Sequence, residues 1–501
     1  MICVLTVTPV TAGAQSYSII DNIRLRQLPC ATEIRRYLTS NPAAMNRLDT
    51  LSLAHLSLGA DHLRMNEPVM EQHGDGHTDF FLKAEAYKRL DNAGVAWGSA
   101  GFTTSKIRNV RWTDCIDYDL IAPYTLGDDK GGDLQTQRYE FGGGYATALG
   151  TWTLGVHLSY RAEIAYRDVD PRIRTVVSEL KAQLGATHPA GDLYTAGIAA
   201  GFTRYDQNCA IDFYNPINDT NTYPLTGLGS WYHRFMGNTN KSSGNEAMGW
   251  NVTASLLNAG SEGANVEIGY ESYRMEQRLR NFNNITPGYT DNDILTARAS
   301  YGLTPGGTLV VLPVVSWTLL GREGTENLFG TAAGSSYDKI GSRKSYRHKR
   351  MTAEAKCHLQ FNTVGGYLTI TPGATYSTDS ERLIDPARSV RVHNATGALG
   401  ADFSRATGSK LYWQISLSGD CCHVTDKQAT LPGLDLTSPL GQCVEHNYRM
   451  LSADRISGLA AASMGLLYGD VLIRISAGCH HVRYDGHGGS NRIFASISTI
   501  F

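Results

Sequence analysis

Hydrophobic and polar side chains alternate along residues 152–166, and this pattern predicts the class of the whole protein. The even positions run apolar from Trp152 to Tyr166, whereas the odd positions include Arg161 and Glu163. Successive side chains of a β-strand point to opposite faces, so one face is apolar with aromatic ends and the other is polar. An apolar face toward lipid and a polar face toward a wet lumen are typical of a transmembrane β-barrel.

The same alternation recurs along the chain and predicts an all-β fold, a closed antiparallel transmembrane β-barrel of about 18 strands. An even number of strands is usual for single-chain bacterial barrels. The expected strands lie near residues 50–65, 77–90, 94–107, 135–149, 151–167, 173–187, 191–206, 246–258, 264–280, 292–303, 307–321, 347–361, 365–378, 389–404, 410–423, 447–468, 470–484 and 490–501.

The links between these strands support the count independently. Links after even-numbered strands are short and contain the Gly, Asn, Asp and Pro residues of tight turns, as at 91–94 and 304–307. Most links after odd-numbered strands are long, as at 108–134, 207–245 and 322–346. Short periplasmic turns that alternate with long outer loops indicate the outer membrane of a Gram-negative cell.

The last expected strand ends on an aromatic residue. Ile493, Ala495, Ile497 and Phe501 share one face of it. This terminal pattern resembles the signal read by the outer-membrane barrel assembly machinery. We therefore expect that machinery and outer-membrane lipid as partners, with Phe501 as the assembly signal.

The first 48 residues precede the barrel, which we place at 49–501. Residues 1–14 read as the apolar part of a signal peptide that ends in a small-x-small cleavage site. A basic start is missing, so we expect this signal peptide to be clipped. Residues 15–48 leave two alternatives open, a periplasmic lead-in or a segment tucked into the lumen.

Composition and motifs exclude several classes of function. A formal net charge of −2 gives no field that would favour nucleic acid. The richest apolar run, 309–317, is too short for a transmembrane helix and contains Pro313. No cofactor is expected. The chain lacks G-x-S-x-G, H-E-x-x-H and P-loop motifs, so we do not expect an enzyme, with a membrane-embedded lipid hydrolase as the remaining alternative.

Charged side chains on the faces opposite the apolar ones are the candidates for lining the lumen. An 18-stranded barrel is too wide for side chains alone to fill, so an aqueous channel or a folded-in plug is expected. The mixed signs allow either a polar pathway with weak ion selectivity or Arg–Glu pairs that brace the wall. The candidates are Lys83, Glu85, Arg138, Glu140, His157, Arg161, Glu163, Glu179, Lys181, Glu267, Glu271, Arg298, Glu354, Lys356, His358 and Arg474.

The outer loops contain two further features with chemical potential. The basic run at 340–350 could bind anionic lipid A or an acidic glycan, or it could be a solvated loop. Cys421 or Cys422 could form a disulfide with Cys443 in an oxidising compartment.

A metal site is not predicted, although one stretch contains weak candidate ligands. His73, Asp75 and His77 could place imidazole and carboxylate groups around an ion. Gly74 and Gly76 between them suit a plain hairpin tip equally well.

Several stretches carry a resemblance to a known family. They are Asn41-Pro-Ala-Ala-Met45, Tyr139–Tyr145, Trp152–Tyr166, Asp168–Arg172 and the terminal Phe501. Together they resemble a group of uncharacterised Bacteroidota outer-membrane β-barrels, which implies location and architecture but no catalytic residues. The stretch from Asn41 is also similar to the N-terminal signature of FadL-type fatty-acid transporters, which implies a hydrophobic ligand.

These observations favour an outer-membrane channel, or the barrel of an uptake system, that passes small solutes. Active uptake would require an energised transporter partner. One alternative is a scaffold barrel with a blocked lumen that holds a surface lipoprotein or glycan. Another is a hydrophobic-ligand transporter.

Overall fold

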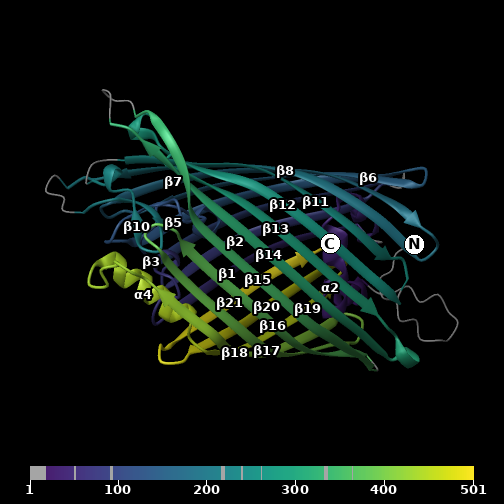
Figure 1. The fold of residues 1–501 in the computed structure, drawn as a ribbon. Coiled ribbons are helices and arrows are strands. Elements are labelled where there is room, and N and C mark those ends of the chain that lie inside the picture. Colours follow the sequence, from purple (N-terminus) through teal and green to yellow (C-terminus); the bar gives the residue numbers. More distant parts are fainter. Residues whose placement is uncertain are drawn as a thin grey trace.

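A closed ring of antiparallel strands makes up most of the protein (Figure 1). The computed structural model describes residues 19–49, 52–90, 94–215, 220–237, 241–260, 262–331, 337–363 and 365–501. Eighteen long strands form one sheet, and the ring closes between β1 (Leu53–Met65) and β21 (Gly489–Ile500), where Ala60 pairs with Ala495. The predicted closed 18-stranded barrel is therefore confirmed.

The expected strands correspond one to one with the observed strands, but most of the observed strands are longer. β15, for example, covers 25 residues, because backbone pairing continues where the apolar alternation has ended. The remaining long strands are β2 (Gly76–Arg89), β3 (Gly94–Val110), β5 (Gly132–Leu149), β6 (Trp152–Tyr166), β7 (Arg172–Ala190), β8 (Tyr194–Asp212), β11 (Lys241–Asn258), β12 (Gly263–Leu279), β13 (Gly288–Gly302), β14 (Leu309–Phe329), β15 (Lys339–Thr363), β16 (Gly366–Leu383), β17 (Arg388–Thr407), β18 (Leu411–Thr430), β19 (Arg455–Tyr468) and β20 (Val471–Tyr484).

One strand was expected to begin earlier than it does. The strand placed at 447–468 begins only at Arg455, because α4 (Pro439–Leu451) occupies the preceding residues. The Ser438 hydroxyl accepts a hydrogen bond from the Gly441 amide, and Pro439 lies in the first turn. A serine N-cap followed by proline favours a helix start.

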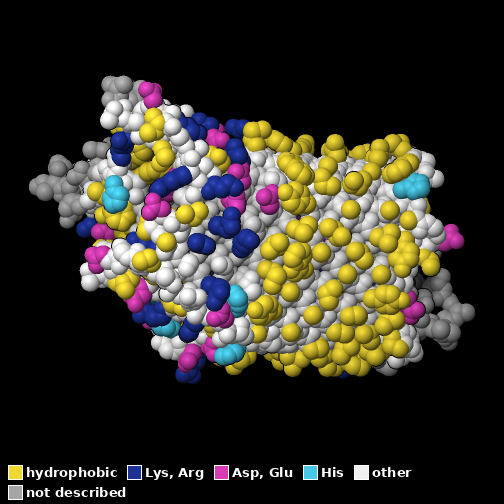
Figure 2. Space-filling view, in the orientation of Figure 1, with side chains coloured by type: hydrophobic (Ala, Val, Ile, Leu, Met, Phe, Trp, Pro, Cys, Tyr) yellow, Lys and Arg dark blue, Asp and Glu magenta, His cyan; other side chains and the backbone are white. Residues whose placement is uncertain are grey.

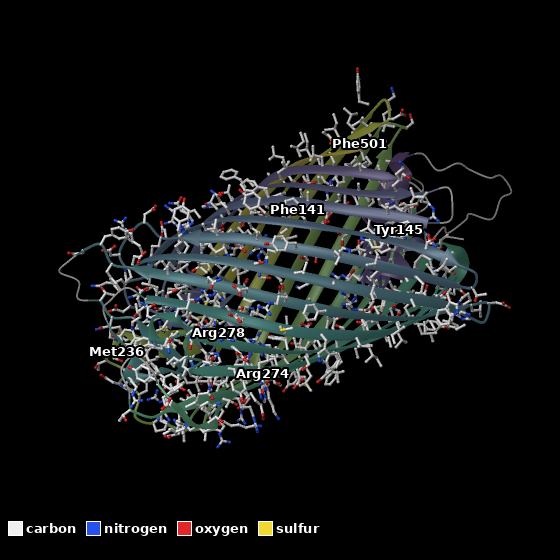
Figure 3. The ribbon with its side chains drawn as sticks, turned by 90° about the horizontal axis from the view of Figure 1, so that it is seen from above. Phe141, Tyr145, Met236, Arg274, Arg278 and Phe501 are labelled. Atoms are coloured by element: carbon white, nitrogen blue, oxygen red, sulfur yellow. The ribbon has the colours of Figure 1, made fainter. Side chains whose placement is uncertain are left out.

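The outer surface separates an apolar zone from a charged zone. Figure 2 shows hydrophobic side chains over the half of the visible face toward the short turns, and charged side chains toward the long loops. In the apolar zone Trp152, Leu154 and Leu158 are 50%, 43% and 53% exposed. Seen from above, Phe141 and Tyr145 lie in this half, whereas Arg274 lies toward the long-loop end (Figure 3). The apolar zone is the surface that would contact lipid.

The long loops fold over and into one end of the barrel. A small sheet of β4 (Leu126–Gly127), β9 (Tyr223–Gly227) and β10 (Ser230–Trp231) forms there. Short helical turns accompany it: η2 (Glu71–His73), α3 (Tyr118–Ile121), η3 (His233–Phe235) and η4 (Arg280–Phe282). At the opposite end the turns are short, and η5 (Pro305–Gly307) is one of them.

The chain before the barrel forms α1 (Ile19–Arg26), α2 (Pro29–Thr39) and η1 (Pro42–Arg47). Most residues from Ile23 to Leu48 are buried or half-buried. Within the described ranges, no helix combines the length and the apolar character needed to cross a bilayer.

Candidate functional site

Residues 19–48, which we call the lumenal segment, contact strands on all sides of the ring. Ile23 packs against Tyr412 of β18 and against Leu472 and Ile500 of β20 and β21. A second cluster joins Cys30 and Ile34 to β14, and a third joins Tyr37, Leu38 and Met45 to β2, β3, β5 and β11. These contacts lie near the short turns, so the lumenal segment spans the barrel interior at that end.

The tip of the lumenal segment lies on a patch of three glycines, which we call the glycine cradle. A Cβ atom on Gly155 would lie 2.3 Å from the Pro42 carbonyl carbon, and one on Gly185 would lie 2.0 Å from the Asn41 Oδ1. Gly197 completes the cradle, because a Cβ there would lie 3.0 Å from the Asn41 Nδ2. The absence of side chains lets the backbone of the segment touch the wall directly.

Asn41 links this tip to the strands by hydrogen bonds. Its Nδ2 donates to the Ala186 and Ile198 carbonyl oxygens at 3.3 and 3.1 Å, and its Oδ1 accepts from the Ala43 amide at 2.9 Å. The Gln183 side chain also donates to the Ser40 carbonyl oxygen at 3.0 Å. The Asn-Pro-Ala-Ala stretch therefore acts here as a docking element between β7 and β8.

A buried carboxylate fixes α2 to the wall on the other side of the lumen. Glu33 Oε2 lies 3.1 Å from Lys356 Nζ of β15, and Glu33 Oε1 lies 4.0 Å from Arg298 Nε of β13. The Glu33 side chain is 4% exposed. The Arg298 guanidinium also lies over the Tyr37 ring, 5.7 Å from its centroid. A buried charge needs such partners, because desolvation without them is costly.

Burial also changes the acid–base chemistry of the lumenal segment. Removal from water raises the pKa of the Cys30 thiol to about 12 and that of the Tyr37 hydroxyl to about 12. Both groups are therefore neutral at ordinary pH, and the Cys30 thiol is a poor nucleophile.

At the other end, residues 111–131, which we call the inward loop, enter the barrel. Cys115 and Ile121 pack against Val177 and Tyr205 of β7 and β8 and against Met275 of β12. This loop was expected to be an outer loop, so its position inside the barrel is a feature that the strand pattern missed.

Asp114 anchors the first part of the inward loop. Its carboxylate accepts hydrogen bonds from the Ser243 hydroxyl at 2.7 Å and the Leu126 amide at 3.0 Å, and its carbonyl oxygen accepts from the Thr175 hydroxyl at 2.7 Å. Burial raises the pKa of the Asp114 carboxyl above its ordinary value. The anchor is therefore sensitive to the charge of this group.

Arg322 of β14 holds the second part of the loop. Its guanidinium donates to the Ala122 carbonyl oxygen at 2.5 Å, to that of Asp119 at 2.9 Å and to Asn292 Oδ1 at 2.6 Å. Arg322 is only 3% exposed, and backbone carbonyls together with the Asn292 side chain accept from its donors, so it is a rigid support for the loop.

Arg161 of β6 connects the inward loop to the wall. Its nitrogens lie 2.6 Å from Asp117, 3.1 Å from Glu163 and 3.1 Å from Glu179. The Tyr205 hydroxyl donates to the same Asp117 carboxylate at 2.9 Å. One guanidinium thus bridges three carboxylates, a geometry that suits its planar set of donors.

A polar cavity of about 320 Å³, which we call the central cavity, lies on the inner face of β2, β3, β5, β6 and β7. Its wall near the segment includes His157, whose Nδ1 accepts from the Trp97 indole at 3.1 Å. Its wall near the loop includes Arg161. Seven of the sixteen predicted lumen residues line it: Lys83, Glu85, Glu140, His157, Arg161, Glu179 and Lys181.

The other predicted lumen residues occupy different positions on the inward faces. Arg298, Lys356 and Glu267 contact the lumenal segment, the last through the Ser40 hydroxyl. The remainder lie elsewhere along the wall: Arg138 with Glu163, Glu354 beside Lys356, His358 with Thr371, Glu271 on β12 and Arg474 on β20.

The weak metal candidates turn toward separate partners. His73 lies 3.4 Å from Asp119, Asp75 lies 3.4 Å from Arg108, and His77 lies 3.6 Å from Asp61. In the described ranges, no group of three or more His, Cys, Asp or Glu side chains converges.

The loop disulfide proposed from the sequence is not formed. Each cysteine in the described part of the chain is a free thiol. Cys421 and Cys422 lie in the β17–β18–β19 ladder, whereas Cys443 is buried in α4 and accepts a hydrogen bond from Gln72 at 3.5 Å. The helix that replaced the expected strand residues accounts for this separation.

Sequence patterns did not reveal the groups that bring the wall residues together. Glu33, Asp117 and the glycine cradle come from segments whose position inside the barrel carries no periodic signal. The Thr32–Leu38 stretch lies within α2, and its single acidic residue, Glu33, is the one that meets Lys356.

The sequence also identifies a family. The chain belongs to the DUF6850 family, described as a family of unknown function, whose model matches residues 42–501. No curated protein matches the chain at a significant level.

The chain is also similar to several solved structures, all of them distant in sequence. The ferric preacinetobactin receptor BauA from Acinetobacter baumannii has a TM-score of 0.41 and 7% identity, over 90% of this chain and 80% of that one. The ferric citrate transporter FecA has a TM-score of 0.41 and 10% identity, over 89% and 78%. The copper transporter OprC has a TM-score of 0.40 and 9% identity, over 89% and 80%.

Proposed function

We propose that this member of the DUF6850 family is an uptake barrel of the Gram-negative outer membrane. In this proposal, the lumenal segment and the inward loop gate the central cavity, which binds a small hydrophilic solute. A closed ring of strands with an apolar outer zone and a polar interior supports the membrane location.

The central cavity is the observation that carries the proposal. Its size falls within the range of small-molecule sites. Lys83, Arg161 and Lys181 line it together with Glu85, Glu140 and Glu179, so donors and acceptors face the same space. Such a lining suits a solute that carries both acidic and basic, or many hydroxyl, groups and disfavours a fatty acid.

The lumenal segment supplies the gate on the short-turn side, which is the periplasmic side of a barrel in this orientation. It is held by polar contacts at the glycine cradle and by the Glu33–Lys356 ion pair, together with small apolar clusters. Polar tethers of this kind can be exchanged for water when the segment is pulled. An energised periplasmic partner is therefore the expected source of opening.

The experiment is planar-bilayer conductance of the refolded chain from residue 15 and of a version from residue 49. We expect the longer chain to stay closed at rest and the shorter one to conduct steadily. Steady conductance by both would indicate a passive pore, and silence of both would contradict a transport role.

A covalent lock keeps the test informative if the shorter chain fails to fold. Ser40→Cys and Gln183→Cys, joined by a short bis-maleimide after Cys421→Ser and Cys479→Ser, would fix the segment to β7. In mild urea, the unlocked barrel should conduct ions and the locked barrel should stay closed. Equal currents through both would mean that the barrier to ion flow is not the lumenal segment.

The obstruction of both ends also favours a second candidate, a scaffold barrel that holds a surface lipoprotein. Trp112, Leu225, Leu440 and Cys443 join the inward loop, the 213–240 loop and α4 into one apolar cluster above the barrel. Such a cap could present a binding surface. Co-purification of a stoichiometric lipoprotein that is lost when residues 213–240 are deleted would favour this candidate.

A further inference from the structure

A hollow of about 760 Å³ lies in the outer surface of the barrel over β12–β17. Small side chains form its floor, among them Ala297, Ala353 and Ala355, and the larger Trp317 and Tyr376 stand beside them. These side chains point away from the lumen, because they share a face with the exposed Val315 and Leu319. The hollow therefore opens toward the acyl chains of the bilayer.

Basic side chains occupy the same outward face just beyond this hollow. Strand pairing aligns Trp317, Ala353 and Tyr376 in one row of the ladder. Lys349 lies four residues from Ala353 along β15, toward the long-loop end, and Arg347 lies two residues further in the same direction. Four residues of strand span about 14 Å, which brings a phosphorylated head group within reach of both the hollow and these cations.

The cations on this surface outnumber the acids. Arg347 and Arg382 are directly opposite each other in the β15–β16 ladder, and like charges in this position repel. Glu323 pairs with Arg347 at 2.7 Å and also with Lys344.

Further cations lie on the same surface, and not all of them have an acidic partner, so the net charge of the surface is positive. Arg391 pairs with Asp426 at 2.9 Å. Among the described residues, no ion pair involves Lys349 or Arg382, and both are exposed. Residues 340–350, all part of β15, place basic side chains on both faces of the sheet. Arg347 and Lys349 are on the outward face, whereas His348 and Arg350 turn inward to Asp379.

We infer that this surface binds a phosphorylated, multiply acylated glycolipid of the outer leaflet. Its acyl chains fill the hollow, and its phosphate groups lie between Arg347, Lys349 and Arg382. A phosphate there relieves the repulsion of the facing arginines and accepts their paired N–H donors. The proposal does not depend on transport, because these residues lie on the outside of the barrel.

The binding test uses native mass spectrometry of the full barrel with diphosphorylated, hexa-acylated lipid A. We expect one tightly held lipid per barrel and at least tenfold weaker binding of the dephosphorylated form. Lys349→Gln with Arg382→Gln should weaken binding roughly 10- to 30-fold, since each cation near anionic lipid contributes on the order of 1 kcal/mol. Ala353→Leu with Ala355→Leu should also weaken binding by filling the hollow.

Arg174→Gln with Arg204→Gln is the matched control. These exposed arginines lie on the outward faces of β7 and β8, away from the hollow. Unchanged binding by Lys349→Gln/Arg382→Gln, or an equal loss in the control, would overturn the inference. So would full displacement of the lipid by millimolar inorganic phosphate, which would indicate a site for free anions.

Discussion

Gly155 of β6 and Pro42 of the lumenal segment touch through their backbones, since a Cβ atom on Gly155 would lie 2.3 Å from the Pro42 carbonyl carbon. Gly155 has no left-handed φ angle that would demand glycine for conformational reasons. The small size of this residue is therefore needed for the contact and not for the strand itself.

Gly155→Leu is expected to displace the lumenal segment without unfolding the barrel. The segment should become sensitive to added protease, and the barrel should conduct. Gly400→Leu is the control, because Gly400 also faces the lumen but a Cβ atom there would lie 3.7 Å or more from its nearest neighbours. Equal protease sensitivity in both variants would refute the docking role of the glycine cradle.

Removal of the Glu33 charge is expected to loosen α2. Glu33→Gln removes the carboxylate that Lys356 and Arg298 share, and because Lys356 keeps Glu354 as a partner we expect a cost of about 1.5 kcal/mol, roughly a 10-fold change in the closed-to-open ratio. Open probability in bilayer recordings measures this change. Glu354→Gln should have little effect, because Glu354 pairs with Lys356 on the wall alone.

A double variant separates the ion pair from general packing. Glu33→Leu with Lys356→Met replaces both charges by apolar groups of similar size, and we expect it to restore much of the closed state. A double variant as open as Glu33→Gln would mean that the pair itself is not what holds α2.

Replacement of Arg161 by lysine is expected to free the inward loop, although the charge is kept. An ammonium group cannot bridge Asp117, Glu163 and Glu179 at once. Hydrogen exchange of the Ile116 amide, which donates to Gln207 at 3.1 Å, should accelerate. Arg138→Lys is the control, since Arg138 binds Glu163 but not the loop; equal acceleration there would contradict the bridge.

Stability of the inward loop is expected to fall as pH rises. Burial raises the pKa of the Asp114 carboxyl, so the folded loop binds this proton more tightly than the opened loop does. The contribution is complete below the ordinary aspartate range and is lost as pH rises through the raised pKa. This loss of stability can be measured as the hydrogen-exchange protection of the Leu126 amide at a series of pH values. Asp114→Asn should remove the dependence of that protection on pH. A pH dependence that the substitution leaves unchanged would exclude Asp114 as its source.

The positions of the membrane strands follow from the sequence because each must present apolar side chains to one side and polar ones to the other. The strand expected at 151–167 is observed at Trp152–Tyr166, one residue shorter at each end, for this reason. β15 was expected at 347–361 yet runs from Lys339 to Thr363. Beyond the apolar zone nothing requires alternation, and the strand continues through backbone hydrogen bonds to its neighbours.

The site itself was only partly predictable. Period-two alternation suggests the face of Arg161 but not its partner Asp117, which lies 44 positions away and meets it because the loop turns inward. Gly155, Gly185 and Gly197 look like ordinary strand glycines until three strands place them side by side. Long-range juxtapositions of this kind have no local signature.

The 25 residues of β15 have a consequence for how a ligand meets the cell. A tilted membrane strand needs only about 9–11 residues to cross the hydrocarbon core. At about 3.4 Å per residue, more than half of β15 therefore rises above the lipid as a stiff collar. In the proposed outer-membrane location, the mouth of the barrel would stand among or beyond the sugars of the surface glycolipids, and a solute would reach it without first diffusing through that layer.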